Sequence, residues 1–455
     1  MTHMTRKITG FTPVKVPLGT EPMGLWQSLR AMRRNVLSII PDLAIRQPMV
    51  SGRTGRRWHM VMEPGALKRI LFDNLDNYPK SLATKSLLKG AIGESLFIAE
   101  GAHWRWQRQT AAPAFSHRNV MALAPVMSAA AEQAVKRLHE AGPRAVEMSA
   151  EMTSATFDVI SDVTFSGDAG FDRAAVHKAI DRYIDEVGRV TLMDLLGVPD
   201  WVPRPGRLFA ANGVEEMKRV ADRAVVSRAM SGPRALPDLL DLLRAGSDPE
   251  TGRQMTSGEL RDNLMAFIVA GHETTALALS WSLYLLAQDQ DAQDRAREEA
   301  RAVINGVATG EDVAKLPFIR QVLDEALRLY PSAALISRTA RAPDMLCGRE
   351  IRRNDTVILP IYALHRHRML WDAPDEFRPE RFEAGKPERY SYLPFGGGPR
   401  ICIGASFALM EAVIILGSLL ANFRFTPVKG RTPEPVMIIT LRPEGGIWLE
   451  AEPIT

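Results

Sequence analysis

Cys402, one of the two cysteines of the chain, lies in a glycine-rich run, residues 395–404, which reads FGGGPRICIG. Its three consecutive glycines let the backbone turn tightly and approach a flat ligand closely. A helix is predicted directly after Cys402, and its positive N-terminal end would favour a thiolate over a thiol. Arg400 adds a cation suited to a carboxylate. The run therefore predicts a thiolate site, and the alternative is a buried, inert cysteine in a glycine-rich turn.

An acid and an alcohol stand side by side in the run 270–275, which reads AGHETT and interrupts an apolar segment. Such groups are costly to bury in an apolar helix without a purpose. Thr274 follows Ala270 by four residues, so its hydroxyl can bond that carbonyl and open the helix locally. The groove formed in this way can hold water and a substrate. The alternative is a threonine bonded to its own helix beside a surface glutamate.

Two further pairs have helical spacing. Glu325 and Arg328 lie three positions apart on one predicted helical face, so their side chains can pair. Trp104 and Arg108 lie one turn apart and could face a single ligand. For Arg108 the alternative is an ordinary surface arginine.

These four patterns, taken in their order along the chain, resemble the cytochrome P450 superfamily. The pattern Phe-x-x-Gly-x-Arg-x-Cys-x-Gly is the heme-ligand loop of that superfamily, and every fixed position is present between Phe395 and Gly404. The resemblance runs from Trp104 to Cys402, with family-like sequence on to the C-terminus. It implies a mainly α fold with small β-sheets, in a single triangular heme-thiolate domain.

The resemblance also implies that heme b is the cofactor and that the Cys402 sulfur is the protein's ligand to its iron. It assigns the propionates to Trp104, Arg108, Arg338 and Arg400. The full set of residues that it implies for heme binding is Trp104, Arg108, Ala270, Thr274, Arg338, Pro394, Phe395, Arg400, Cys402 and Gly404.

Two other roles follow from the resemblance. Glu273 and Thr274 match the acid–alcohol pair that delivers protons to dioxygen. Glu325 and Arg328 match two members of a triad whose third member would be Arg381, in the run 379–382 that reads PERF. A buried glutamate between two arginines needs good geometry. We therefore expect the triad to shape the heme-binding core and not to take part in chemistry.

The function implied is that of a monooxygenase, which inserts one oxygen atom of O₂ into an organic substrate by hydroxylation or epoxidation. No flavin or nicotinamide module is visible, since Gly396–Gly398 opens no βαβ unit. Reducing equivalents from NAD(P)H should therefore arrive through separate proteins, a ferredoxin and its reductase. Arg105 and Lys386 are candidate contacts for an acidic partner. One rival is a peroxide-using peroxygenase of the same fold, and another is a non-enzymatic heme sensor or carrier.

Family position also suggests the substrate pocket, whose candidates are Val269, Leu335, Ile336, Ile438, Ile439 and residues between Ser81 and Ile98. Because these side chains are largely apolar, the substrate should be a hydrophobic small molecule. A medium or long aliphatic chain, such as a fatty acid, is favoured over a terpenoid, steroid or aromatic compound.

The overall composition fits this interpretation. Of 455 residues, 46% are hydrophobic and 24% charged, and the net charge is only +4, which suits a globular protein with no nucleic-acid partner. Two cysteines make no disulfide framework, so a reducing, cytoplasmic setting is expected. The start of the chain shows no signal peptide or membrane anchor. We expect an extended arm over residues 1–24, a single heme domain over residues 25–455, and a monomer.

Helical spacing dominates after residue 66. The segment 264–287 is apolar enough to suggest a membrane span, but the polar residues at its middle favour a buried central helix. The other predicted helices are 104–112, 122–141, 149–164, 174–190, 214–230, a helix from Pro317 that stops at Pro331, and 403–420. Strands are predicted at 56–61, 356–360, 436–441 and 447–449.

Overall fold

The computed structural model describes residues 11–21, 23–165, 205–385 and 387–454. The predicted helix 174–190 and Lys386 lie outside these residues. The described helices are α1 (Leu25–Arg34), α2 (Pro64–Lys68), α3 (Leu82–Ile92), α4 (Gly101–Ala111), α5 (His117–Ala141), α6 (Met148–Phe165), α9 (Pro205–Ser231), α10 (Leu239–Ala245), α11 (Ser257–Gln288), α12 (Gln290–Val303), α13 (Pro317–Leu329), α14 (Ile361–Leu364) and α15 (Ala405–Asn422). The strands are β1 (Met49–Thr54), β2 (Arg56–Val61), β3 (Ala145–Glu147), β4 (Ile336–Thr339), β5 (Asp344–Leu346), β6 (Arg349–Ile351), β7 (Thr356–Leu359), β8 (Phe423–Pro427), β9 (Glu434–Met437), β10 (Leu441–Glu444) and β11 (Trp448–Pro453). The predicted fold class, mainly α with small sheets, is confirmed.

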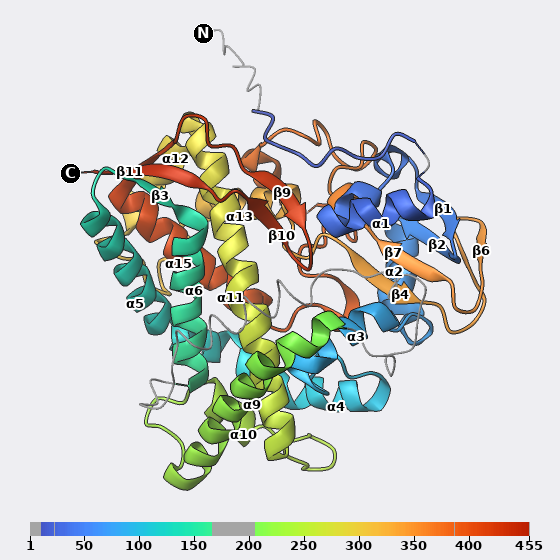
Figure 1. Cartoon of the computed structure of the whole chain (residues 1–455). Coiled ribbons are helices and arrows are strands. Elements are labelled where there is room, and N and C mark those ends of the chain that lie inside the picture. The colour runs from blue at the N-terminus through green and yellow to red at the C-terminus, as the bar shows by residue number, and fades with distance from the viewer. Residues whose placement is uncertain (1–10, 22, 166–204, 386, 455) are drawn as a thin grey trace.

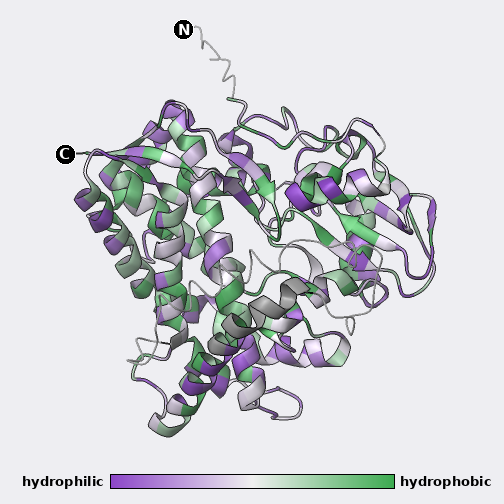
Figure 2. Ribbon diagram, viewed as in Figure 1, coloured by the Kyte–Doolittle hydropathy of each residue, from purple (hydrophilic) through white to green (hydrophobic). Residues whose placement is uncertain are grey.

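Helix α11 runs through the middle of the molecule and packs against α6, α9, α13 and α15 (Figure 1). It starts at a capping box, in which the Thr256 side chain accepts from the Glu259 N–H and the Glu259 carboxylate accepts from the Thr256 N–H. Figure 2 shows hydrophobic residues along its middle, whereas outward-facing turns of α1 and α12 are largely hydrophilic. Among the described helices, α11 and α15 are long and apolar enough to cross a membrane, yet 72% and 61% of their apolar windows are buried in protein. That burial fits core helices.

The strands form small sheets around this helical body. The largest has the order β1-β2-β7-β4, with β2 and β7 parallel and the other pairs antiparallel. Strand β11 pairs with β3 and β8, and β9 pairs with β10 as a hairpin. The prediction of one strand over 436–441 was wrong, because residues 438–440 form the turn between β9 and β10. Figure 1 shows this hairpin beside α11, between the helices and the four-stranded sheet.

The N-terminal segment is extended where it is described, and it packs on the domain. The Val16 N–H donates to the Tyr362 hydroxyl at 2.9 Å, and Val16 itself is buried. Phe11 forms a β-bridge with Phe377. The segment therefore covers part of the core.

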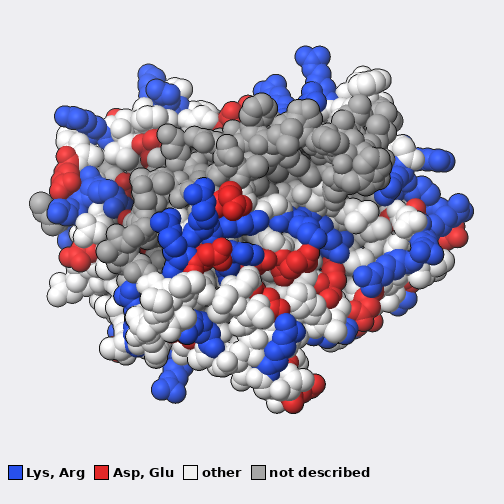
Figure 3. Space-filling view, turned by 60° about the horizontal axis from the view of Figure 1, so that its bottom comes forward, with Lys and Arg blue, Asp and Glu red and all other residues white. Residues whose placement is uncertain are grey.

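Charges of both signs are interspersed on the face at the bottom of Figure 1, which Figure 3 turns toward the viewer. Several of the arginines near the start of α11 are paired locally. Arg253 lies 2.7 Å from Glu259, and Arg261 lies 2.9 Å from Asp262. Basic and acidic side chains on this face thus compensate each other over short distances.

Candidate functional site

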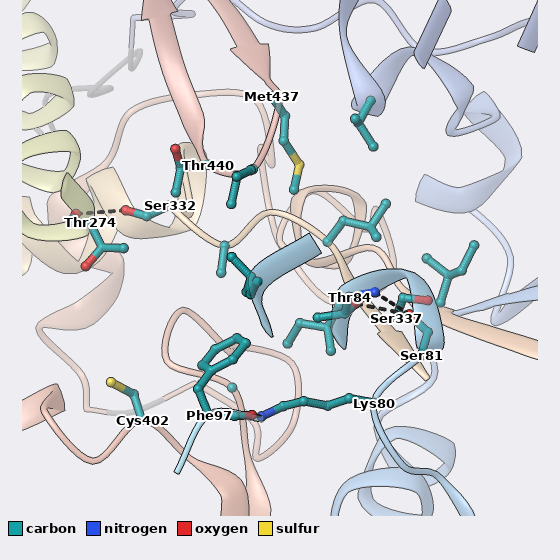
Figure 4. A pocket seen from close by; sticks show the side chains of 18 of the residues that line it. Lys80, Ser81, Thr84, Phe97, Thr274, Ser332, Ser337, Cys402, Met437 and Thr440 are labelled. Carbon is teal, nitrogen blue, oxygen red and sulfur yellow. Dashed lines mark hydrogen bonds between the residues drawn. The ribbon is translucent and has the colours of Figure 1, made fainter. Parts of the chain in front are cut away.

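Residues from distant parts of the chain meet around one cavity of about 1230 Å³. Figure 4 shows Cys402 and Thr274 at one end, Lys80 and Ser81 at another, and Met437 and Thr440 on the β9–β10 hairpin above them. All the residues predicted for heme binding line this cavity, as do the five apolar pocket candidates Val269, Leu335, Ile336, Ile438 and Ile439. The structure therefore brings these two predicted sets together. Their individual roles stay predictions.

Glycines shape the Cys402 loop. Gly396 and Gly398 have φ of +74° and +67°, a region that side chains rarely adopt. A Cβ at Gly398 would also overlap the carbonyl oxygen of Leu71. The Cys402 N–H closes the loop by donating to the Phe395 carbonyl at 2.9 Å. Larger residues at Gly398 would therefore displace the loop that aims the thiol into the cavity.

Cys402 is exposed and lines the cavity. Burial raises the pKa of its thiol, and the Gly404 N–H and the Arg108 cation act in the opposite direction. Arg108 belongs to α4 and contacts the Cys402 loop, where its Nη1 donates to the Ile401 carbonyl at 2.8 Å. These contacts offer a thiolate one N–H and one nearby positive charge, which suits a sulfur that ligates a metal.

Arg338 is a buried cation in the lining of the cavity. It is 6% exposed, its Nε has no hydrogen-bond partner, and Nη1 reaches only the Ser337 carbonyl at 3.3 Å. No carboxylate of the described residues forms an ion pair with it. Burial, with the Arg400 cation nearby, lowers the pKa of Arg338 to about 10. A buried cation left in this state calls for an anionic ligand, and the carboxylates of a heme fit that requirement.

Two neighbours complete this cationic corner. Arg400 pairs with Glu100, donates to the Ala99 carbonyl at 3.1 Å and stacks 4.3 Å from the Trp104 ring. Lys80 forms a β-bridge with Arg338 and donates to the Phe97 carbonyl. Burial and the two arginines hold the pKa of Lys80 well below its usual range. Sequence reasoning missed Lys80, because only the pairing of residue 80 with residue 338 brings it here.

The acid–alcohol pair lies on the cavity side of α11. The Thr274 hydroxyl donates to the Ala270 carbonyl at 2.8 Å, as its spacing predicted. The Thr274 carbonyl accepts from the Ser332 hydroxyl at 2.9 Å (Figure 4). Glu273 is 7% exposed, accepts from the Thr440 hydroxyl at 2.8 Å and pairs with Arg442. The alternative of a surface glutamate is therefore wrong, and sequence reasoning missed the two partners.

The predicted triad has the expected geometry. Arg328 binds both oxygens of Glu325 at 2.7 and 2.8 Å, and Arg381 Nε lies 2.9 Å from the same carboxylate. The remaining Arg328 donors reach the carbonyls of His365, Pro374 and Glu376. None of the triad residues lines the cavity. This placement agrees with a structural role.

Most of the segment 364–368 is buried. His365 is wholly buried: its Nε2 accepts from the Leu393 N–H at 2.8 Å, and its Nδ1 faces the Arg328 carbonyl at 3.2 Å. Burial and the neighbouring arginines lower the pKa of His365 to about 3. His365 thus connects α13, at Arg328, to the non-regular segment at Leu393 that leads into the Cys402 loop.

A cysteine that faces an apolar cavity lined by the central helix α11, near a buried arginine that pairs with no carboxylate of the described residues, fits the class of heme-thiolate proteins. The family model of cytochrome P450 matches residues 23–450, so the chain belongs to the cytochrome P450 family. The family implies heme iron and O₂ as participants. It also places the chain among oxidoreductases that incorporate oxygen, and one relative is named cyclooctat-9-en-7-ol 5-monooxygenase.

Individual relatives extend over most of the chain. A cytokinin hydroxylase of Arabidopsis thaliana is 31% identical over 417 residues, covering 86% of this chain and 78% of the relative. Cyclooctatin synthase of Streptomyces melanosporofaciens is 30% identical over 420 residues, covering 90% and 91%. The chloroplastic LUTEIN DEFICIENT 5 protein of Arabidopsis thaliana is 29% identical over 402 residues, and the match spans 82% of this chain but 66% of that protein. The heme domain of cytochrome P450DA superposes with a TM-score of 0.80 at 26% identity, covering 90% of each chain.

Proposed function

We propose that this enzyme hydroxylates a hydrophobic small molecule with an extended aliphatic part, using electrons from a ferredoxin and its NAD(P)H-dependent reductase in the cytoplasm. The observation that carries the proposal is one cavity in which Cys402, the Glu273–Thr274 pair and an apolar lining meet. When bound, the heme supplies the oxidation chemistry, and the protein supplies position and protons.

Each group of residues has a part in that proposal. Cys402 would ligate the iron, and Arg338, Arg400, Trp104 and Arg108 would hold the propionate end. Thr274, bonded to Ala270, would keep α11 open enough to seat a water molecule. Glu273 would hold or release a proton on the same face of the helix.

The shape of the lining favours an aliphatic acid over a compact ring system. The apolar part of the cavity reaches from α11 to strands β1 and β2, which Figure 1 places at the far edge of the molecule. There Arg53, Arg56 and Arg57 join the lining. Arg57 already lies 3.4 Å from Asp355, whereas Arg53 and Arg56 form no ion pair with a described carboxylate. A carboxylate at one end of a long chain would complement these two arginines.

The names of the relatives do not select a substrate, because cytokinin and cyclooctat-9-en-7-ol are different compounds. One of these two relatives is named a hydroxylase and the other a monooxygenase, which supports oxygenation over a carrier role. The Glu273–Thr274 pair supports O₂ and a reductase over peroxide. Of the two basic residues suggested for partner contact, Arg105 is exposed and pairs with exposed Asp76 at 2.9 Å.

The decisive experiment is a visible spectrum of the purified ferric protein, titrated with dodecanoic acid, dodecanol, a diterpene alcohol, a steroid and an aromatic acid. We expect a thiolate-type heme spectrum that changes from low to high spin with dodecanoic acid, and less with dodecanol. Cys402→Ser should lose the thiolate signature. Absence of that signature in the wild type would overturn the proposal, and a shift with another class would redirect the substrate. Turnover with hydrogen peroxide alone, and none with ferredoxin and reductase, would establish the peroxygenase instead.

A further inference from the structure

The turn between β9 and β10 contacts two functional regions at once. Its residues Ile438, Ile439 and Thr440 line the cavity. Thr440 also donates to Glu273 at 2.8 Å, and Arg442, two residues further on, pairs with the same carboxylate. Figure 4 shows Thr440 on the hairpin close to Ser332 and Thr274, at the same end of the cavity as Cys402 and above it in this view.

Further bonds fix this end of the hairpin to α11. The Trp281 indole N–H, two turns beyond Glu273, donates to the Leu441 carbonyl at 3.1 Å. The Leu441 N–H donates to the Ser332 carbonyl at 3.1 Å. The Ser332 hydroxyl in turn donates to the Thr274 carbonyl at 2.9 Å. The start of β10 and the residue before it therefore bind α11 directly at Glu273 and Trp281. They also bind it at Thr274 through Ser332.

The charges at this junction favour one orientation of the acid. Glu273 is 7% exposed, so a carboxylate at this position needs hydrogen-bonding or charged partners. The Thr440 hydroxyl from the turn and the Arg442 guanidinium from β10 restrict its rotamer, as preorganised polar groups do in other sites. Because the preceding turn is apolar and faces the cavity, a bound substrate would press on the same segment.

We propose that Thr440 and Arg442 are positioning residues for Glu273, so that the β9–β10 hairpin links occupation of the cavity to the placement of the acid that supplies protons. The inference rests on the proposed monooxygenase function. It predicts that substrates which fill the space against Ile438 and Ile439 are oxygenated with little loss of electrons to peroxide.

The first arm of the test needs no turnover. Unfolding midpoints of the ferric holoprotein are measured for Arg442→Gln, Glu273→Gln and the double variant. We expect strong non-additivity, with the double variant no less stable than Arg442→Gln alone, because each single change breaks the same pair. Arg431→Gln is the matched control: Arg431 stacks 4.9 Å from the Trp448 ring and does not line the cavity. Its effect should add to that of Glu273→Gln.

The second arm measures product and hydrogen peroxide per NADPH consumed, with a surrogate ferredoxin and reductase and dodecanoic acid as the probe. Arg442→Gln should divert several-fold more electrons to peroxide at an unchanged dissociation constant for the probe, and Arg442→Lys should restore part of the yield. Should Arg442→Gln fail to fold, Thr440→Val and Arg442→Lys carry both arms.

Additive midpoints, or a wild-type product yield in every hairpin variant, would overturn the inference. A non-additive cycle together with no product from dodecanoic acid in the wild type would retain the Arg442–Glu273 link and refute the proposed substrate. The failure of one proposal is thereby distinguished from the failure of the other.

Discussion

Glu325 and Glu273 are both bound by arginines, but their surroundings differ. Glu325 and Arg328 are fully buried, and carbonyl groups satisfy the remaining donors of the arginine. Glu273 lies at the wall of a cavity, and its partners Thr440 and Arg442 come from a hairpin whose turn faces that cavity. The polar groups of the Glu325 cluster bind one another and nearby carbonyls, away from the cavity, so its role is structural. The Glu273 cluster depends on a segment that lines the cavity, so we expect its geometry to respond to binding.

The largest effect should come from breaking the saturated cluster. Glu325→Gln leaves Arg328 and Arg381 buried without their counter-charge, which costs about 3–5 kcal/mol in comparable buried pairs. We expect a matching loss in the free energy of unfolding and a low yield of heme-containing protein. Denaturant unfolding of the ferric holoprotein measures the first, and the visible spectrum measures the second. A loss below about 1 kcal/mol would remove the distinction between the two clusters.

The cluster also predicts a pH dependence through His365, which bonds to Leu393 and faces the Arg328 carbonyl. Burial lowers the folded-state pKa of His365 from its ordinary value of about 6.5 to about 3, so the folded state keeps it neutral while the unfolded state takes up a proton. The stability that neutral His365 contributes is present above pH 6.5 and is lost as the pH falls toward 3. The loss is about 1.4 kcal/mol per pH unit.

Unfolding free energies between pH 7 and 5 test this sign. His365→Gln should lower the free energy of unfolding at neutral pH. It should also reduce the proton uptake on unfolding at pH 5 by nearly one proton, so the free energy of unfolding depends less on pH. A variant with the full wild-type slope would show that another group causes the acid destabilisation.

The same contrast explains what the sequence could predict. The Cys402 loop, the Thr274–Ala270 bond and the Glu325–Arg328 pair are local patterns, so their spacing was sufficient. Lys80 reaches its position through a β-bridge to the distant Arg338, and Arg442 reaches Glu273 because the β9–β10 hairpin packs against α11. No local spacing encodes either contact. The turn at 438–440 was mistaken for strand because Ile-Ile-Thr is a β-branched run without glycine, proline or asparagine. It forms the turn of the β9–β10 hairpin, and its side chains line the cavity.

A weaker effect is expected from Glu273→Gln in the absence of substrate. A glutamine can still accept from Thr440, so the change removes mainly the charge-assisted part of the interaction. That part is worth about 1.5 kcal/mol, since the Arg442 side chain is 27% exposed and water screens it. Thermal and denaturant unfolding of the ferric holoprotein should place this variant between wild type and Glu325→Gln. A loss as large as that of Glu325→Gln would mean that the hairpin cluster is structural as well.

The smallest effect calibrates the series, because it uses the same Glu→Gln change at an open pair. Lys136 and Glu140 lie 3.9 Å apart on α5, with side chains 67% and 65% exposed. Their attraction is screened by water, so Glu140→Gln should change the free energy of unfolding by no more than about 0.5 kcal/mol. Unfolding in low and high salt checks the screening directly. If Glu140→Gln cost as much as Glu273→Gln, exposure would not explain the ranking, and the cavity cluster could not be treated as a coupled element.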